Sequence, residues 1–446
     1  MRSITDVIRH FKQNWMRELC PEAIERACRD HGMTWRQSTL NPIVTVQVFF
    51  LQVLHGNTAC AHLPHLSNLV FTAAAYCKAR TRLKLDVLKT LLQRSVEQLQ
   101  DNAIDKSRWF GHRVFLVDGS SFSMPDTDEL QEHFGQPGGQ RAGCGFPTAH
   151  WLAMMHAGTG MITKMLAAPL RTHDLAKTAE LHPELRANDV LVADRGFCSF
   201  AHFALLLQRG THGVLRIHQR LLVDFTPGRT HTVPGKGKSC GKKGLPRSRW
   251  LRQLGNNDQV VEWFKPTSCP TWMSIEQFDA LPGSLVIREL RYTITQRGFR
   301  TRTITLATTL LDGDKYKSSD LATLFRDRWD IETNFGHLKT TMKMDVLKCT
   351  TVNGVLKELH VFALIYNLVR QVILIAAEQQ QVDFRRISFT DALRWLQTAR
   401  PGDSIPNLIV NPLRRHRLEP RVRKRRPKQY PLMKRPRCQL QNELAP

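Results

Sequence analysis

The run VFLVDGSSF, at residues 114–122, decides the fold class that the sequence predicts. It is rich in Val, Phe and Leu and ends its apolar part at Asp118, so a strand followed by a turn is expected. A second apolar run, VLVADRGF at 190–197, also leads into an acid, Asp194, and the short run VLRI follows at 214–217. Stretches with helical periodicity alternate with these later runs. Strands first, and then helices alternating with strands, predict an α/β layer with a mixed sheet.

Helical patterns flank this predicted layer. Residues 1–105 predict an all-helical domain, because VLKTLLQRSVEQL at 87–99 spaces its apolar residues as a helix does and no long alternating run competes with it. After the layer, the sequence predicts two long strands at 285–295 and 300–310 with a hairpin turn at 296–299, and long helices at 319–345 and 352–378.

The chain carries a strong excess of positive charge. Its 446 residues contain 64 Lys and Arg against 39 Asp and Glu, which gives a formal charge of +25 at neutral pH. Segment 218–256 holds nine bases and one acid, and segment 413–437 holds twelve bases and one acid. Such an excess opposes compaction unless an anionic surface balances it, so it predicts a polyanionic partner. The proline-interrupted second segment is expected to form an extended basic arm that contacts DNA phosphates.

Composition also limits where the protein works. The hydrophobic fraction of 42% is that of an ordinary globular protein, and the ten cysteines lack any CxxC pair, so reduced thiols are expected instead of a disulfide framework. The N-terminus lacks the apolar stretch of a signal peptide, and the apolar run at 361–377 is too short and polar to span a bilayer, so it predicts a buried helix. A cytoplasmic protein with no membrane partner is expected. The glycine-rich run at 135–145 lacks the ending of a phosphate-binding P-loop.

Three acidic residues occupy settings suited to catalysis. Asp118 and Asp194 follow predicted strands, where α/β sheets generally bind ligands, and Glu332 lies in the helical run LATLFRDRWDIETNFGHLK at 321–339. Carboxylates suit Mg²⁺, and three that converge can hold two ions about 4 Å apart for phosphodiester chemistry. The residues alone leave a simpler interpretation open, because Asp-Gly after a strand is also a common turn.

The helix that contains Glu332 carries a charged stripe. Phe325, Arg328, Glu332 and Lys339 fall within about 60° of one another on a helical projection. A stripe of this kind is usually a solvated face with ion pairs. Here apolar residues share or flank it, so the stripe is expected to be half-buried, and paired charges in such a place indicate a site.

The stretch FRDRWDIETNFGHLK resembles the signature of the transposase family of the bacterial insertion element IS4. That signature has Tyr, Arg, Glu and Lys separated by two, three and six residues, and this sequence keeps the spacing with Phe325, Arg328, Glu332 and Lys339. VDGS, with Asp118, and DRGF, with Asp194, resemble the two other acidic motifs of the family. The runs MPDT (124–127), YCKAR (76–80), IYNLVR (365–370) and the basic tail (424–437) are similar to family members too, so the resemblance covers nearly the whole chain.

The resemblance implies a ribonuclease-H-like mixed-sheet catalytic core with a β-rich insertion, preceded by an all-α N-terminal domain. It also implies a catalytic triad of Asp118, Asp194 and Glu332 that binds two Mg²⁺ ions, with Mn²⁺ as a substitute. The expected division is 1–105 as the helical N-terminal domain with a candidate role in binding element ends, 106–217 as the first part of the core, 218–312 as the basic β-rich insertion, 313–380 as the part that completes the core, and 381–446 as the C-terminal region with the basic arm.

The function that the resemblance implies is DNA transposition. The protein would cleave double-stranded DNA at terminal inverted repeats and join the 3′-hydroxyl ends to target DNA. It would act as a homodimer or higher oligomer on paired ends, at the bacterial nucleoid. Phe325, Arg328 and Lys339 would contact DNA. The phenyl ring of Phe325 lacks the hydroxyl that a tyrosine donates to phosphate, so the formation of a hairpin intermediate stays an open question.

Other interpretations also stay open at this point. Trp250, Trp263 and Trp272 are all candidates to stack on a flipped base, and each is equally suited to ordinary packing. A second hypothesis is a catalytically silent DNA-binding protein derived from a transposase. A third, a glycosidase that uses paired carboxylates without metal, would leave the basic excess unexplained.

Overall fold

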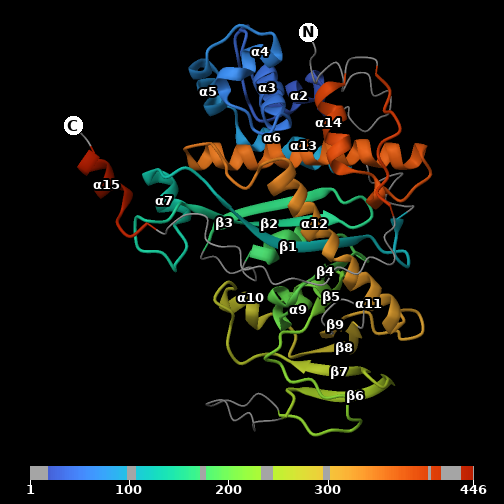
Figure 1. Cartoon of the computed structure of the whole chain (residues 1–446). Coiled ribbons are helices and arrows are strands. Elements are labelled where there is room, and N and C mark those ends of the chain that lie inside the picture. The colour runs from blue at the N-terminus through green and yellow to red at the C-terminus, as the bar shows by residue number, and fades with distance from the viewer. Residues whose placement is uncertain are drawn as a thin grey trace.

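The computed structural model describes residues 19–97, 107–170, 177–232, 245–294, 302–399, 403–412 and 433–444. Within this part of the chain, nine strands form one mixed sheet in the order β3-β2-β1-β4-β5-β9-β8-β7-β6 (Figure 1). The strands are β1 Val114–Ser123, β2 Thr148–His156, β3 Ile162–Pro169, β4 Val190–Ala193, β5 His212–Arg216, β6 Ser248–Gly255, β7 Asp258–Phe264, β8 Ser284–Ile294 and β9 Arg302–Thr308. The predicted mixed α/β architecture is confirmed.

Three parallel strands lie at the centre of the sheet. β1 pairs in parallel with β4, and β4 pairs in parallel with β5, whereas the other neighbouring strands are antiparallel. The side chains of β1 alternate between two hydrophobic cores. Val114 and Leu116 join the larger core, and Phe115 and Val117 join a second core with helix α9 (Phe200–Gln208). Burial on both faces explains why this strand reads as a continuous apolar run.

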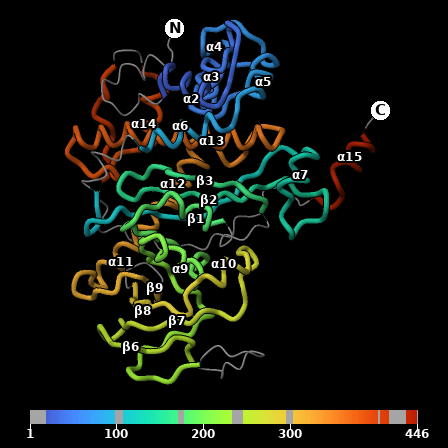
Figure 2. Tube along the Cα trace, turned by 180° about the vertical axis from the view of Figure 1, so that it is seen from behind, coloured from blue at the N-terminus to red at the C-terminus, as the bar shows by residue number. Residues whose placement is uncertain are grey.

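The four strands from β6 to β9 continue the same sheet. β9 pairs with β5 on one side and with β8 on the other, and β7 and β6 follow outward to the edge. Figure 2 shows these strands at the end of the molecule farthest from the N-terminal helices. The predicted pair of long strands is confirmed as β8 and β9, while their connecting turn at 296–299 lies outside the described residues.

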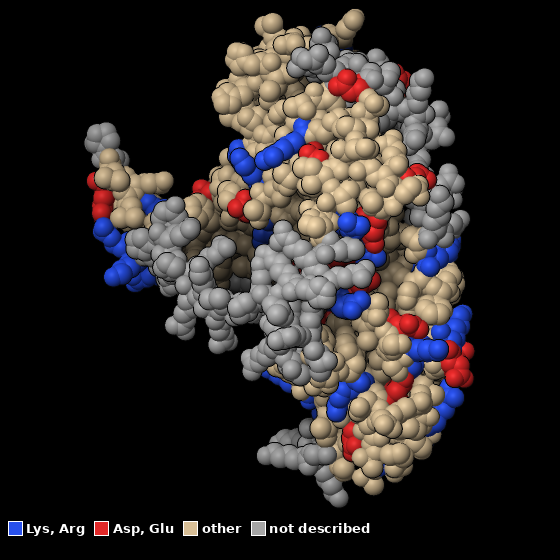
Figure 3. All heavy atoms as spheres, turned by 45° about the vertical axis from the view of Figure 1, so that its right-hand side comes forward, with Lys and Arg blue, Asp and Glu red and all other residues tan. Residues whose placement is uncertain are grey.

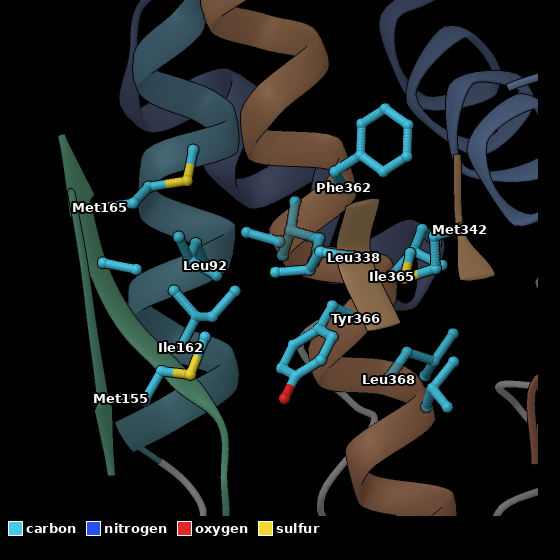
Figure 4. Packing of buried hydrophobic residues seen from close by; sticks show 14 of the residues in the cluster. Leu92, Met155, Ile162, Met165, Leu338, Met342, Phe362, Ile365, Tyr366 and Leu368 are labelled. Atoms are coloured by element: carbon cyan, nitrogen blue, oxygen red, sulfur yellow. The ribbon is translucent and has the colours of Figure 1, made fainter. Parts of the chain in front are cut away.

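The described residues between 19 and 97 form helices and no strand. These helices are α2 Pro21–Asp30, α3 Pro42–Leu54, α4 Leu63–Ser67, α5 Ala73–Arg82 and α6 Leu85–Glu97. They share the larger hydrophobic core with the long helix α13 (Val352–Gln379) and with one face of the sheet. Figure 4 shows this junction, where Leu92 of α6, Ile162 of β3 and Phe362 of α13 pack together.

Helix α13 is the central helix of the larger core. It is the one helix within the described part of the chain that is long and apolar enough to cross a membrane, but 94% of its most apolar stretch is buried inside the protein. The buried helix predicted around 361–377 is confirmed. Further α-helices are α7 Asp128–Phe134, α10 Ile275–Asp279, α11 Ser318–Asp327, α12 Trp329–Gly336, α14 Phe389–Thr398 and α15 Arg437–Leu444.

The single long helix predicted at 319–345 is wrong, because the structure divides this segment into α11, α12 and a π-helical turn at His337–Thr341. At the first junction the Arg328 N–H donates to Phe325 O at 3.2 Å, which is a three-residue step instead of the four-residue step of an α-helix. At the end, Met342 N donates to His337 O, and Lys343 then adopts a left-handed φ of 63°. Local changes of hydrogen-bond step leave the apolar periodicity intact, so the sequence pattern did not reveal them.

The IYNLVR run at 365–370 attaches α13 to the β2–β3 turn. Asn367 accepts from Ile162 N and donates to Ile162 O, each at 2.9 Å, and Tyr366 Oη donates to Gly160 O at 3.0 Å. The Arg370 guanidinium donates to Thr159 O. These side chains are buried, so this run of the sequence has a structural role in the described protein.

Replacing Asn367 by Leu is expected to lower the free energy of unfolding by about 3 kcal/mol, because the buried N–H and C=O of Ile162 would both lose their partner while the side-chain volume stays similar. Urea unfolding followed by circular dichroism measures the change. The matched control is Gln379→Leu at the exposed end of α13, which should change the value by less than about 0.5 kcal/mol. Equal stability of the two variants would contradict a structural role for Asn367.

Candidate active site

The parallel pairing of β1 and β4 brings two of the predicted acids to neighbouring strands. Val117 pairs with Ala193, and Asp118 and Asp194 are the next residues of their chains. Because side chains alternate along a strand, Asp118 points to the face opposite to Val117, which is the face that helix α12 contacts. The sheet register therefore places both carboxylates at the same level of the sheet.

Arg328 connects this part of the sheet to Glu332. Its Nη1 donates to Asp118 Oδ2 at 2.8 Å, and its Nη2 donates to Glu332 Oε1 at 3.2 Å. Asp194 has a basic partner of its own, because Arg216 Nη1 of β5 lies 3.4 Å from its Oδ1. The structure therefore brings β1, β4, β5 and α12 together through charged side chains.

The electrostatics of Asp118 agree with this convergence. Burial raises the pKa of the Asp118 carboxyl above its usual value, and the negative charges of Glu332 and Asp194 act in the same direction. The Arg328 guanidinium and the Gly119 N–H, which donates to Asp118 Oδ1 at 2.8 Å, lower the pKa and so act against that shift. Because three neighbouring carboxylates repel one another, a cation that binds among them relieves this repulsion and is bound more strongly.

The donor chemistry of these residues fits a divalent cation. Carboxylate oxygens are the ligands that Mg²⁺ prefers. Within the described ranges, however, no group of three or more His, Cys, Asp or Glu side chains is already spaced to hold a metal ion. The Arg328 guanidinium lies between Asp118 and Glu332, so a cation that binds these two acids has to take its place as their charge partner.

Arg328 itself is unusually buried for a charged side chain. Only 4% of the side chain is exposed, and its Nε is buried without a hydrogen-bond partner in the protein. Its guanidinium carbon lies 5.6 Å from the centroid of the Phe325 ring and 5.6 Å from the centroid of the Trp329 ring. This environment fixes the guanidinium beside the two acids.

The two rings beside Arg328 differ in exposure. Phe325, expected to contact DNA, is only 2% exposed and belongs to the larger core, so in this structure it supports Arg328 and offers no surface to a ligand. Trp329 is 44% exposed. Sequence reasoning did not select Trp329 as a binding residue, although a tryptophan directly after the signature arginine was a signal that could have found it.

Lys339 lies beside the same strand as Asp118. It belongs to the π-helical turn, and its Nζ donates to Ser121 O at 3.0 Å and to Ser120 Oγ at 3.3 Å. The signature residues Arg328, Glu332 and Lys339 therefore all gather along β1.

The three tryptophans predicted as stacking candidates already have partners within the protein. Trp263 Nε1 donates to Glu289 Oε1 at 2.8 Å, and burial raises the pKa of that carboxyl. Trp272 stacks on His202 with 5.0 Å between ring centroids, and Trp250 Nε1 donates to the Gln253 side chain at 3.4 Å. The first two contacts give these rings clear packing roles.

The two basic segments are only partly described. Residues 233–244 and 413–432 lie outside the described ranges, and the second range contains most of the predicted extended arm. On the face in Figure 3, the described Lys and Arg side chains are interspersed with Asp and Glu. Within segment 218–256, Arg249 pairs with Glu262 and the Arg229 guanidinium donates to Ser248 O.

The C-terminal helix α15 is attached through its first residue to the segments before and after α7, and it projects from the body beside α7 (Figures 1 and 2). Arg437 Nη1 donates to Asp126 Oδ2 at 2.8 Å, and its guanidinium carbon lies 3.8 Å from the centre of the Phe146 ring. Before segment 413–432, Asn411 N donates to Arg386 O at 2.7 Å. Both flanks of that segment are therefore bound to the rest of the protein.

Asp118 lies within β1, so the turn predicted directly after it is wrong, because the chain continues as a strand to Ser123. Asp194 directly follows the adjacent parallel strand β4, and Glu332 lies on helix α12. Residues 109–368 match the family described as "Transposase DDE domain", so the chain belongs to that transposase family.

The similar proteins refine this assignment to the IS4 type. The chain is 24% identical over 384 residues to the transposase InsG of insertion element IS4 from Escherichia coli K12, covering 80% of this chain and 78% of InsG. It is also 23% identical over 138 residues to InsZ of the same strain, which carries a transposase name, covering 31% of this chain and 46% of InsZ. These matches confirm the resemblance to IS4-family transposases. The cryo-EM structure of the piggyBac transposase synaptic complex with hairpin DNA covers 89% of this chain and 80% of its own at 11% identity, with a TM-score of 0.38.

Proposed function

We propose that this transposase cleaves DNA at the terminal inverted repeats of its element and transfers the 3′-hydroxyl ends to target DNA. The observation that carries the proposal is the convergence of Asp118, Asp194 and Glu332, two of them linked through one buried arginine. Family membership supports a reaction on DNA.

Asp118, Asp194 and Glu332 are the residues proposed to hold divalent metal. When bound, two Mg²⁺ ions, or Mn²⁺ in their place, supply an activated water or hydroxyl and stabilise the leaving oxygen. The side chains around them prepare this chemistry. The side chain of Asp118 is half-buried and bound by Arg328, and Arg216 pairs with Asp194.

Arg328 and Lys339 are the proposed phosphate-binding residues. Arg328 now donates to Asp118, and if a cation were to bind that carboxylate, the same guanidinium N–H would be available to donate to a phosphate oxygen beside the acids. Lys339 is held next to β1 by Ser120 and Ser121 and provides a second positive charge. Phe325 contributes by supporting Arg328 from the core.

We infer a ribonuclease-H-like core for this protein. The order β3-β2-β1-β4-β5, with three antiparallel strands followed by two strands parallel to β1, supports it. The domain division proposed from the sequence stays a proposal, with 1–105 as the N-terminal domain, 106–217 and 313–380 as the core, 218–312 as the insertion and 381–446 as the C-terminal region. The all-helical character of described residues 19–97 supports the first boundary.

The proposed partners are double-stranded DNA at the element ends and at the target. We also propose a homodimer or higher oligomer on paired ends, and a location at the bacterial nucleoid, since the substrate is there. The large formal positive charge supports the DNA partner. A silent DNA-binding derivative is the alternative, and the retention of all three acids together with Arg328 and Lys339 favours the active enzyme. The glycosidase hypothesis is set aside because the chain belongs to a transposase family.

The test is a cleavage assay on the DNA that flanks the reading frame, carrying the inverted repeats. Purified protein with Mg²⁺ or Mn²⁺ is expected to cut at the repeat boundary and to join the 3′ ends to a target plasmid, and a chelator should stop both steps. Salt-sensitive binding without any strand cut in either metal would support the silent alternative.

Trp329→Ala is expected to weaken binding of end DNA by about tenfold, because an exposed indole beside the acids can stack on a base at roughly 1–3 kcal/mol. Trp329→Phe should keep most of the affinity. Fluorescence anisotropy on labelled end DNA measures both, with Leu207→Ala, at a 37% exposed position of α9, as the control that should bind normally. Normal binding by Trp329→Ala would contradict a stacking role.

A further inference from the structure

Two cysteines in the N-terminal helical region lie in direct contact. Cys60 begins the short helical turn Cys60–His62, and Cys77 lies in the middle of α5. The Cys77 thiol donates to Cys60 Sγ at 4.0 Å. Cys77 is exposed and Cys60 is half-buried, so an oxidant in solution reaches the pair from the Cys77 side.

The surroundings of the pair distinguish it from the other thiols. Arg80 Nη2 donates to Cys77 Sγ at 3.8 Å, and the same guanidinium lies 5.0 Å from the centre of the Phe49 ring, which limits its movement. Burial raises the pKa of Cys60, and Arg80 acts against that rise. Within the described ranges, no other two cysteine sulfurs hydrogen-bond to each other.

We propose that Cys60 and Cys77 form a reversible disulfide when the protein meets hydrogen peroxide. The Cys77 sulfur loses its proton and attacks one peroxide oxygen, the O–O bond breaks, and Cys77 becomes a sulfenic acid. The other peroxide oxygen takes up the thiol proton and leaves as water. Cys60 sulfur then attacks Cys77 sulfur, the S–O bond breaks, and a second water leaves with the Cys60 proton. The two thiols lose two hydrogen atoms in total, and the peroxide is reduced to two waters.

The pair occupies a junction between parts of the fold. Lys357 of α13 donates through Nζ to Arg80 O and Thr81 O, each at 3.0 Å, at the end of the helix that carries Cys77. A disulfide would join the 60–62 turn to α5 across a separation of 17 residues. Closing that loop restricts the unfolded chain, so the oxidised protein is expected to melt at a higher temperature than the reduced protein. This inference is independent of the proposed reaction on DNA.

The experiment treats the full-length protein with hydrogen peroxide, blocks the remaining thiols with iodoacetamide and identifies peptides by mass spectrometry. The expected result is a Cys60–Cys77 linked peptide that disappears after dithiothreitol, together with a rise in melting temperature that reductant reverses. Cys60→Ser and Cys77→Ser should each abolish the link and the rise.

Cys438→Ser is the matched control, because Cys438 is also exposed but lies in α15 without a cysteine hydrogen-bonded to it among the described residues, so this variant should keep the link. The proposal is overturned if peroxide oxidises Cys438 while Cys60 and Cys77 stay open to alkylation. It is also overturned if Cys77 proceeds to sulfinic acid with Cys60 unlinked. Peptide mapping of the unaltered protein distinguishes the disulfide from these other products even if a serine variant fails to fold.

Discussion

Asp118→Asn should reduce metal-dependent cleavage of element ends by about 10³-fold or more while leaving DNA binding intact. The amide keeps the shape of the side chain but removes a charged ligand, and metal-assisted stabilisation of the transition state is worth several kcal/mol, at roughly 1.4 kcal/mol for each tenfold in rate. Because burial already raises the pKa of Asp118, the neutral amide should be tolerated in the fold.

Cleavage is measured on end DNA with Mg²⁺, and binding is measured on the same DNA with Ca²⁺ in its place. Glu180→Gln is the matched control, because Glu180 is an exposed acid that pairs with Lys177, three residues before it, and this variant should cleave normally. Asp194→Asn and Glu332→Gln should behave as Asp118→Asn does. Full cleavage by any one of these three variants would remove that residue from the proposed triad.

Arg328→Met should destabilise the metal-free protein by about 2 kcal/mol, and divalent metal should restore most of that loss. Removing one partner of a buried ion pair typically costs about 3–5 kcal/mol, and the smaller value applies here because Glu332 is 45% exposed and water partly screens it. Without the guanidinium, Asp118 and Glu332 repel each other until another cation lies between them.

Urea unfolding in the presence of a chelator, and again with Mg²⁺, measures this difference. The control is Arg385→Met on an exposed network with Asp327, Asp330 and Asp383, which should lose less than about 1 kcal/mol and show no added dependence on metal. If the Arg328 and Arg385 variants respond equally to metal, the view that Arg328 and the cation exchange places fails.

The sequence predicted the elements of this fold better than their junctions. Apolar runs identified β1, β4, β8, β9 and α13, because burial on one or both faces leaves a regular pattern in the residues. The pairing of β9 with β5, which joins β6–β9 to the rest of the sheet, depends on contacts between residues about 90 positions apart and leaves no local pattern.

The candidate site was predictable as a set of residues but not as an arrangement. The spacing of Arg328, Glu332 and Lys339 indicated one helical face, and the structure reaches their common position along β1 through a helix break and a π-helical turn. The burial of Phe325 and the contact of Arg328 with two acids arise from packing against the sheet, which residue identity does not encode.

The attachment of α15 through Arg437 changes how the basic segment before it should be studied. Deleting everything after residue 412 would remove positive charge, and it would also leave Asp126 and the ring of Phe146 without their contacts, so the core near β1 and α7 would change as well. Substituting the bases of segment 413–432 individually by Gln leaves the anchor in place. Of the two approaches, only substitution separates loss of charge from loss of an intramolecular support.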